Sequence, residues 1–175
     1  VVLDTCTGTG GFLMEAMEVL IQKANNDETL IKNIKENQLI GFEVDSVLFA
    51  LACSNMFLHG DGRTNLLFRS SLLDDKNENI INNKDKDLLN YINSLKPTKC
   101  IINPPYETNS SIKFTLQALK YLEPNGKLII IMPTPTLTQN QNSFTAEVLK
   151  VAKLDFVIRM PYNLNKKKKR TVNTS

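Results

Sequence analysis

The most constraining feature of this sequence is the alternation of short apolar runs with stretches of helical period. The apolar runs predict six strands, at residues 1–3, 39–43, 66–69, 100–102, 127–132 and 154–160. Apolar spacing predicts helices at residues 11–24, 46–58, 87–95, 112–122 and 144–152, while the polar stretch 25–37 is either partly helical or an insertion. We expect Ser46 to cap the helix at 46–58. This alternation is typical of an α/β protein with a doubly wound, mostly parallel sheet. Ligands of such sheets bind beyond the carboxyl ends of the strands, so functional residues are expected just after strands.

The length of 175 residues favours one domain, residues 1–175. The 42% apolar and 22% charged residues are close to the globular average, which argues against disorder, collagen and coiled coil. No apolar run approaches the ~20 residues that a membrane-spanning helix needs. Three widely spaced cysteines (Cys6, Cys53 and Cys100) and a single histidine, His59, argue against a zinc site and against a disulfide framework. We therefore expect no metal, no membrane partner and a reducing, cytoplasmic location.

The net charge of +3 is local rather than general. Residues 166–170 (Lys-Lys-Lys-Lys-Arg) carry +5, so the rest of the chain sums to −2. Two interpretations remain open for this basic run. It is either a solvated loop or a loop that contacts phosphates, which would make binding salt-dependent without specifying sequence.

A glycine-rich turn at residues 4–12 (Asp-Thr-Cys-Thr-Gly-Thr-Gly-Gly-Phe) joins the first strand to the first helix. Its three glycines permit positive φ angles and close approach of the backbone to a ligand. A phosphate-binding P-loop is excluded, because Phe12 and Leu13 stand where Lys and Ser or Thr are required. A dinucleotide fingerprint is disfavoured, because Leu13 also occupies the position of its third glycine. A plain tight turn remains the alternative.

Glu43 ends the second predicted strand, where a carboxylate can accept hydrogen bonds from ribose hydroxyls. It follows Gly11 by 32 residues rather than the usual ~20. An insertion at residues 25–37 would explain the excess. A lone Glu43 would be read as a surface acid, but a glycine turn on the neighbouring strand favours the ribose role.

Asn103-Pro104-Pro105-Tyr106 follows the fourth predicted strand. The two prolines end the strand and remove two backbone donors, while their carbonyls remain as acceptors. Asn103 adds an amide oxygen, and Tyr106 adds an aromatic face. This set suits a planar aminated ring, with Asn103 and the Pro104 carbonyl accepting from the exocyclic amine. The alternative is a proline-terminated strand with a packed tyrosine.

The turn at 4–12 and the box at 103–106 together resemble the N6-adenine DNA methyltransferases. The likeness is strongest to the modification subunit of type I restriction-modification systems and to related fused restriction-methylases. It extends over nearly the whole chain, through residues 41–43, 50–60 and 158–164. The tetrapeptide alone is shared with methylases of RNA and of protein glutamine. The combined set favours DNA.

The resemblance implies a Rossmann-like, S-adenosylmethionine-dependent methyltransferase fold. It implies that Asp4 and the glycines line the methionine end of the cofactor and that Glu43 holds the ribose. Asp74, or the adjacent Asp75, would lie near the cofactor adenine amine. Thr5 departs from the proline usual in the family, which we expect to be tolerated because the glycines carry the geometry. The implied cofactor-binding residues are Asp4, Thr7, Gly8, Gly10, Gly11, Phe12, Glu43 and Asp74.

The implied reaction is transfer of a methyl group to the N6 amine of adenine in DNA, within a restriction-modification system. The catalytic residues would be Asn103, Pro104, Pro105 and Tyr106. The partners would be double-stranded DNA with a flipped adenine and specificity and restriction subunits or domains. Alternatives are methylation of RNA or of protein glutamine through the same box, and a non-catalytic truncated remnant. Both ends of the chain fall in strand-like runs, so we expect a fragment of a longer protein, without N-terminal helical or target-recognition regions.

Four further residues have weaker interpretations. Cys6 lies in the glycine turn but has no base beside it in the sequence, so we do not expect a nucleophile there. His59 lies near a helix end and is read as a cap or surface residue. Tyr162 and Asn163 follow the sixth predicted strand, and we expect them to border the pocket for the target base.

Overall fold

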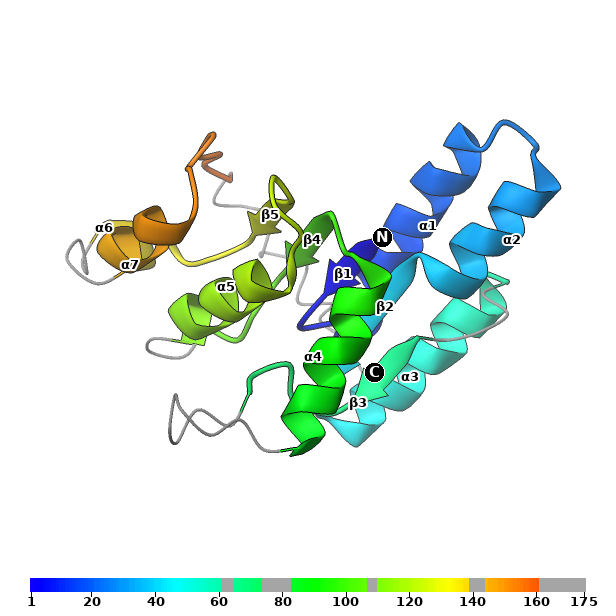
Figure 1. Ribbon diagram of the computed structural model, residues 1–175, viewed down its shortest axis with the longest axis horizontal. Coiled ribbons are helices and arrows are strands. Elements are labelled where there is room, and N and C mark those ends of the chain that lie inside the picture. The colour runs from blue at the N-terminus through cyan, green and yellow to red at the C-terminus, as the bar shows by residue number, and fades with distance from the viewer. Residues whose placement is uncertain (61–64, 74–82, 107–109, 139–143, 161–175) are drawn as a thin grey trace, which may run out of the picture.

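The computed structural model describes residues 1–60, 65–73, 83–106, 110–138 and 144–160, and within them the strands form one parallel sheet (Figure 1). Its five strands lie in the order β3-β2-β1-β4-β5. Their bounds are Val2–Asp4 (β1), Leu39–Glu43 (β2), Leu66–Phe68 (β3), Lys99–Ile102 (β4) and Lys127–Ile130 (β5). The predicted fold class and the first five predicted strands are confirmed, with ends that differ by one or two residues.

Helices connect these strands on both faces. Their bounds are Gly11–Lys23 (α1), Glu28–Asn37 (α2), Ser46–Leu58 (α3), Asn83–Leu95 (α4), Ser110–Tyr121 (α5), Thr134–Thr138 (α6) and Phe144–Val151 (α7). The predicted helix at 87–95 begins four residues earlier than expected. The short helix α6 was not predicted, because its sequence, Thr-Pro-Thr-Leu-Thr, contains no apolar period.

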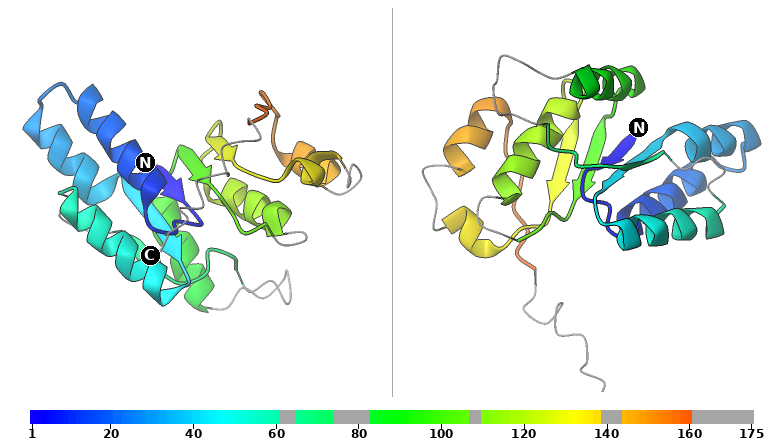
Figure 2. Two further views of the ribbon diagram at one scale, coloured as in Figure 1. Left: turned by 180° about the vertical axis from the view of Figure 1, so that it is seen from behind. Right: turned by 90° about the horizontal axis from the view of Figure 1, so that it is seen from below.

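Two apolar cores lie on opposite faces of the sheet. Successive strand residues alternate between them, so that Val2 and Leu39 belong to one core while Leu3 and Ile40 belong to the other. The first core includes residues of α1, α2 and α3, and the second includes residues of α4 and α5. Figure 2 (right) shows the sheet between these two groups of helices. This is the doubly wound arrangement that strand–helix alternation predicts.

Helix α2 resolves the alternatives for the polar stretch 25–37. Asp27 caps it, since its side chain accepts a hydrogen bond from the Leu30 amide at 3.0 Å. A single fully buried apolar residue, Ile34, anchors the helix to the core beside α1. The stretch is thus a helix inserted before β2, which accounts for the long spacing between Gly11 and Glu43.

The expected sixth strand at residues 154–160 is wrong. This segment has no regular secondary structure, and its large apolar side chains are all more than half exposed. An alternating apolar pattern makes a segment suited to a strand, but a strand forms only where a neighbour supplies backbone partners. An ion pair between the side chains of Lys127 and Asp155 joins this segment to β5.

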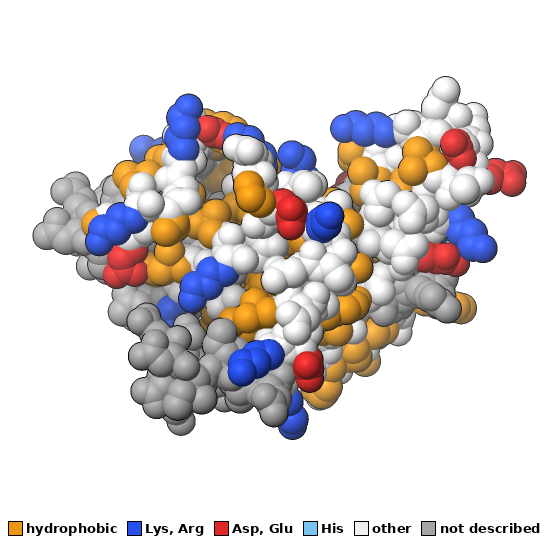
Figure 3. Space-filling view, in the orientation of Figure 1, with side chains coloured by type: hydrophobic (Ala, Val, Ile, Leu, Met, Phe, Trp, Pro, Cys, Tyr) orange, Lys and Arg blue, Asp and Glu red, His pale blue; other side chains and the backbone are white. Residues whose placement is uncertain are grey.

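Helix α3 corrects a second expectation, that Ser46 caps it. Asp45 is the cap, and its carboxylate accepts from the amides of Val47 and Leu48, each at 2.9 Å. The helix carries apolar side chains all around, of which Ala52 and Met56 are buried. Figure 3 shows apolar side chains exposed along the lower right flank, where Figure 1 places α3.

No helix in the described ranges combines the length and the hydropathy that crossing a bilayer would need. The same ranges hold no group of three or more His, Cys, Asp or Glu side chains arranged to hold a metal ion.

Candidate functional site

The glycine turn and the Asn-Pro-Pro-Tyr box follow two neighbouring strands. The turn leaves β1 and the box leaves β4, and these strands pair in parallel through Leu3 and Cys100. The strand order reverses between them, because β2 and β3 lie on one side of β1 while β4 and β5 lie on the other. Crevices at such reversal points are where open α/β sheets bind their ligands.

Asp4 is the most deeply buried acid of the site, with 1% of its surface exposed. One carboxylate oxygen, Oδ1, accepts from the Cys6 amide at 3.0 Å, while Oδ2 is buried without a partner. Burial raises the pKa of Asp4 to about 7; the negative charge of Glu43 adds to the rise, and the bond from Cys6 opposes it. A buried acceptor without a donor destabilises the folded state, unless a ligand supplies the missing donor.

The backbone of the turn is held open by its glycines. Gly8 and Gly10 have φ angles of 56° and 88°, a region that side-chain-bearing residues rarely adopt. A Cβ atom built on Gly8 or Gly11 would meet nothing within 4 Å. The backbone at these two positions therefore faces open space, which a ligand can approach closely.

Glu43 ties the end of β2 to this turn. Its Oε2 accepts from the Gly8 amide, and its Oε1 accepts from the amides of Val44 and Asp45, all three at 2.8 Å. A carboxylate has about four acceptor positions, two on each oxygen. Because Oε2 accepts one bond, from Gly8, it retains one free position. Glu43 thus both fixes the turn and keeps an acceptor for a hydroxyl donor.

Thr7 and Phe12 complete the described part of the predicted cofactor set. Thr7 is buried; its amide donates to the Phe42 carbonyl at 2.9 Å and its hydroxyl to the Asp4 carbonyl at 3.2 Å. Phe12 is half-buried in the first turn of α1. Asp74 and Asp75 lie outside the described residues, as do Tyr162, Asn163 and the basic run 166–170.

The box after β4 presents Asn103 and Tyr106 at the surface. The Tyr106 hydroxyl donates to Asn103 Oδ1 at 2.9 Å, which fixes the orientation of the amide. The Pro104 ring is fully buried, while Pro105 is exposed and Tyr106 is 55% exposed. A rigid, buried proline thus supports an exposed amide and an exposed aromatic ring.

Two residues with weaker interpretations are also placed. Burial, the largest cause, raises the pKa of the Cys6 thiol to about 12, so the thiol stays protonated at neutral pH. This is the opposite of what a nucleophile needs. His59 is the exposed C-cap residue of α3, with Nδ1 2.8 Å from the Asn55 carbonyl.

Three residues that hold the turn were missed from the sequence. Asn55 on α3 donates from Nδ2 to the Thr9 carbonyl at 2.9 Å. Ser71 donates to the Thr5 carbonyl at 2.9 Å, and the Tyr121 hydroxyl donates to the Ser71 carbonyl at 2.6 Å. Their partners lie 46, 66 and 50 residues away, so no local pattern could have indicated them.

A large hollow lies elsewhere, and its position differs from that of the site. It is lined mainly by α5, β5 and residues 148–160; Phe12 of the predicted cofactor set also lines it, whereas Asp4, Glu43 and Asn103 do not. The chemistry-bearing residues lie at the ends of β1, β2 and β4 instead. We therefore place the candidate site by its side chains and not by the hollow.

The donor set fits the cofactor that the resemblance implies. The partnerless Asp4 oxygen suits an ammonium group, and the remaining Glu43 acceptor suits a ribose hydroxyl. The open space beside the backbone of Gly8 and Gly11 leaves room for the cofactor.

Comparisons with solved structures agree with this fold. The chain matches the M protein of the type I restriction enzyme EcoKI with a TM-score of 0.60 and 21% identity, over 78% of this chain and 30% of that one. It matches DrdV in its complex with DNA with a TM-score of 0.61 and 17% identity, over 85% of this chain and 19% of that one. At these identities the likeness concerns the fold.

Sequence comparisons supply the family. The chain is 32% identical over 170 residues to the type II restriction enzyme and methyltransferase RM.BcgI of Heyndrickxia coagulans. The alignment covers 91% of this chain and 24% of the length of that relative. The family model described as N-6 DNA Methylase matches residues 1–174. The chain therefore belongs to the N-6 DNA methylase family.

Proposed function

We propose that this chain is a catalytic core that transfers a methyl group from S-adenosylmethionine to the N6 amine of adenine in double-stranded DNA. The observation that carries the proposal is the position of the two motifs after neighbouring parallel strands. One motif carries a buried, partnerless carboxylate and the other an exposed amide beside an aromatic ring. The first suits a cationic cofactor and the second suits an aminated base.

In this proposal Asp4, Thr7 and the three glycines hold the methionine end of the cofactor, with Phe12 beside them in α1. Glu43 holds the ribose, and Asp74 the adenine amine. When bound, S-adenosylmethionine would supply a methyl group that its sulfonium has already activated: the carbon–sulfur bond breaks as the carbon–nitrogen bond forms, S-adenosylhomocysteine is released, and the amine loses one proton. The remaining task for the protein is to orient and activate the amine that receives it.

The box performs that task on the target base. Asn103 Oδ1 and the Pro104 carbonyl accept hydrogen bonds from N6–H, which favours a more tetrahedral nitrogen with an available lone pair. Pro105 keeps the backbone rigid around them. The adenine must first leave the duplex. Stacking on the exposed ring of Tyr106 offsets about 1–3 kcal/mol of that cost.

The partners in this proposal are duplex DNA and the specificity and restriction subunits or domains of a restriction-modification system, in the cytoplasm. Its test is methyl transfer from radiolabelled S-adenosylmethionine to three acceptors: unmethylated DNA, RNA and protein. Label at adenine N6 of DNA supports it. Label in RNA or in protein glutamine supports the alternative substrates instead, and cofactor binding without any transfer indicates a non-catalytic remnant.

Asn103→Ala is the variant that tests the mechanism. It removes the amide acceptor but leaves the glycine turn intact. We expect transfer to fall at least about 100-fold, the usual loss when one oriented hydrogen-bonding group of an active site is removed, with unchanged affinity for S-adenosylmethionine.

Asn93→Ala provides the matched control, because Asn93 is exposed on α4, outside the site. It should retain full transfer. Turnover by Asn103→Ala at the wild-type rate would remove Asn103 from the catalytic set.

A further inference from the structure

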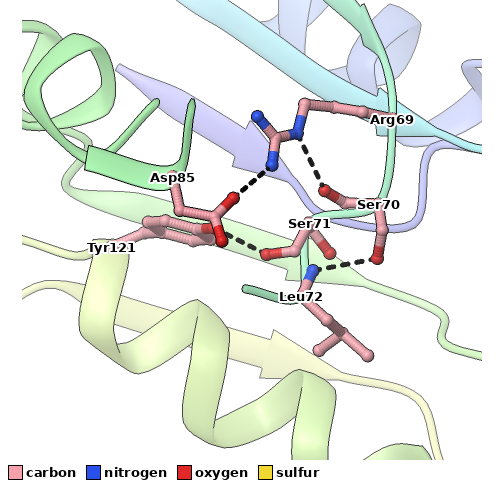
Figure 4. A network of polar contacts seen from close by, with 6 residues as sticks. All are labelled: Arg69, Ser70, Ser71, Leu72, Asp85 and Tyr121. Atoms are coloured by element: carbon pink, nitrogen blue, oxygen red, sulfur yellow. Dashed lines mark hydrogen bonds and ion pairs between the residues drawn. The ribbon is translucent and has the colours of Figure 1, made fainter. Parts of the chain in front are cut away.

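A buried hydrogen-bond relay connects α5 to the glycine turn through Ser71, and Figure 4 shows its first contact, between Tyr121 and Ser71. The Tyr121 hydroxyl donates to the carbonyl of Ser71 at 2.6 Å. The Ser71 hydroxyl in turn donates to the carbonyl of Thr5 at 2.9 Å. Ser71 and Tyr121 are 1% and 2% exposed, so water does not compete for these bonds.

The relay reaches the turn at a sensitive point. Thr5 directly follows Asp4, whose carboxylate has one buried oxygen without a partner. The bond from Ser71 fixes the peptide carbonyl of Thr5, and the Cys6 amide beyond it donates to Asp4 Oδ1. The position of Ser71 therefore bears on the orientation of the Asp4 carboxylate.

The ring of Tyr121 meets the same turn by a second route. It stacks on Phe42 of β2, with ring centroids 5.9 Å apart and an interplanar angle of 12°. The Phe42 carbonyl accepts the amide of Thr7 at 2.9 Å. One side chain of α5 thus contacts two residues that each hold the turn.

The segment that carries Ser71 is itself anchored at its start. Arg69 pairs with the buried Asp85 of α4 at 2.7 Å, and its Nε donates to the Ser70 carbonyl at 3.3 Å. The Ser70 hydroxyl accepts the amide of Leu72 at 3.1 Å. These contacts hold residues 69–72 against α4, so Ser71 is presented to Thr5 from a fixed backbone.

We propose that Tyr121 is a positioning residue for the cofactor: through Ser71 it holds the glycine turn in the conformation that binds S-adenosylmethionine. This inference rests on the proposed function. Tyr121 contacts neither of the reacting groups in this role. Its hydroxyl affects how tightly the cofactor is held and not the chemistry at the target amine.

Tyr121→Phe tests the inference, because it removes the hydroxyl and keeps the ring that stacks on Phe42. We expect the Kd for S-adenosylmethionine, measured by calorimetry, to rise about 5- to 10-fold, the usual effect of one hydrogen bond. At saturating cofactor, kcat should stay within about twofold of the wild-type value, since the target amine is untouched. Tyr91→Phe, at an exposed tyrosine of α4, is the matched control and should change neither quantity.

Ser71→Ala interrupts the same relay, because it removes the hydroxyl that donates to the Thr5 carbonyl. It should weaken cofactor binding to a similar extent, and adding Tyr121→Phe should cost little more, because Tyr121 acts through Ser71. If Tyr121→Phe does not fold, the Kd of Ser71→Ala decides. A raised Kd supports the relay.

Cofactor affinity at the wild-type value in both variants, even with a lowered Tm, would assign Tyr121 a purely structural role and overturn the inference. Additive effects of the two substitutions would overturn it as well. Failure of the wild-type chain to bind S-adenosylmethionine would instead reject the proposed function. Binding by the wild type is therefore measured first.

Discussion

The Asp4 carboxylate combines deep burial, one partnered oxygen and one oxygen without a donor. Its pKa, raised mainly by burial from 3.8 to about 7, lies above the value expected in the unfolded chain. The folded state therefore binds this proton more tightly than the unfolded state does. The contribution of the group to stability is full below about pH 4 and is lost as the pH rises to about 7.

Asp4→Asn is accordingly predicted to stabilise the apo protein in a pH-dependent way. The amide mimics the protonated acid, so the gain should be small near pH 4 and reach about 1–3 kcal/mol above pH 7. Thermal melts at pH 4, 6 and 8 measure it, with Asp87→Asn, at an exposed acid of α4, as the control. The stabilised variant should also bind S-adenosylmethionine more weakly. A gain that does not grow with pH would contradict the raised pKa.

At the residue scale, the sequence could indicate the candidate site only where its residues are consecutive. The glycine turn and Asn103-Pro104-Pro105-Tyr106 can be read from consecutive residues, and the structure brings both to one edge of the sheet. Tyr121 could not be predicted in this way. On the sequence it is one more apolar position of a helical stripe, and its role depends on a carbonyl 50 residues away.

At the scale of elements, helix α3 shows how a boundary is decided. Asp45 and Ser46 are both favourable cap residues, so composition does not choose between them. Asp45 has the extended conformation of a cap, with φ −79° and ψ 123°, whereas Ser46 is already the first helical residue. The sequence expectation was therefore off by one position for a geometric reason.

Asp45→Ala is predicted to cost about 1 kcal/mol of stability, because it leaves the Val47 and Leu48 amides without their acceptor. Ser46→Ala should cost far less and serves as the neighbouring control. Urea denaturation gives both values. Equal losses in the two variants would show that the cap is not Asp45.

The prediction of secondary-structure elements failed where a strand-like segment has no neighbouring strand, and it was incomplete where a helix has no distinct apolar face. Residues 154–160 have a strand-like pattern but pair with no strand in the described structure. Helix α3 carries apolar side chains on all of its sides, so the sequence predicts a helix there but not which side is buried. Helix α2 is the opposite case, because it is largely polar. Its cap and one buried isoleucine are enough to hold it against the core.

At the scale of the whole molecule, charge is unevenly distributed along the chain. The basic run 166–170, outside the described residues, carries +5, and the remaining residues sum to −2. If the chain binds DNA as proposed, most of its salt-dependent affinity should come from this run.

Replacing residues 166–170 by serine is therefore predicted to weaken DNA binding at low salt. Each lost phosphate contact should reduce the slope of log K against log[salt] by about 0.9. The test is fluorescence anisotropy at salt concentrations from about 50 to 200 mM. Replacing Lys84 and Lys86 of α4 is the control. An unchanged slope would identify the run as a solvated loop.

The pairing of β1 with β4 has a consequence for how the reaction is tuned. Adjacent strands lie about 4.8 Å apart, a spacing that backbone hydrogen bonds impose whatever side chains the strands carry. In the proposed reaction, methyl donor and acceptor are bound by loops rooted on these two strands. The distance between the starting points of the two loops is therefore set by the main chain. Substitutions within the loops are expected to leave that distance unchanged.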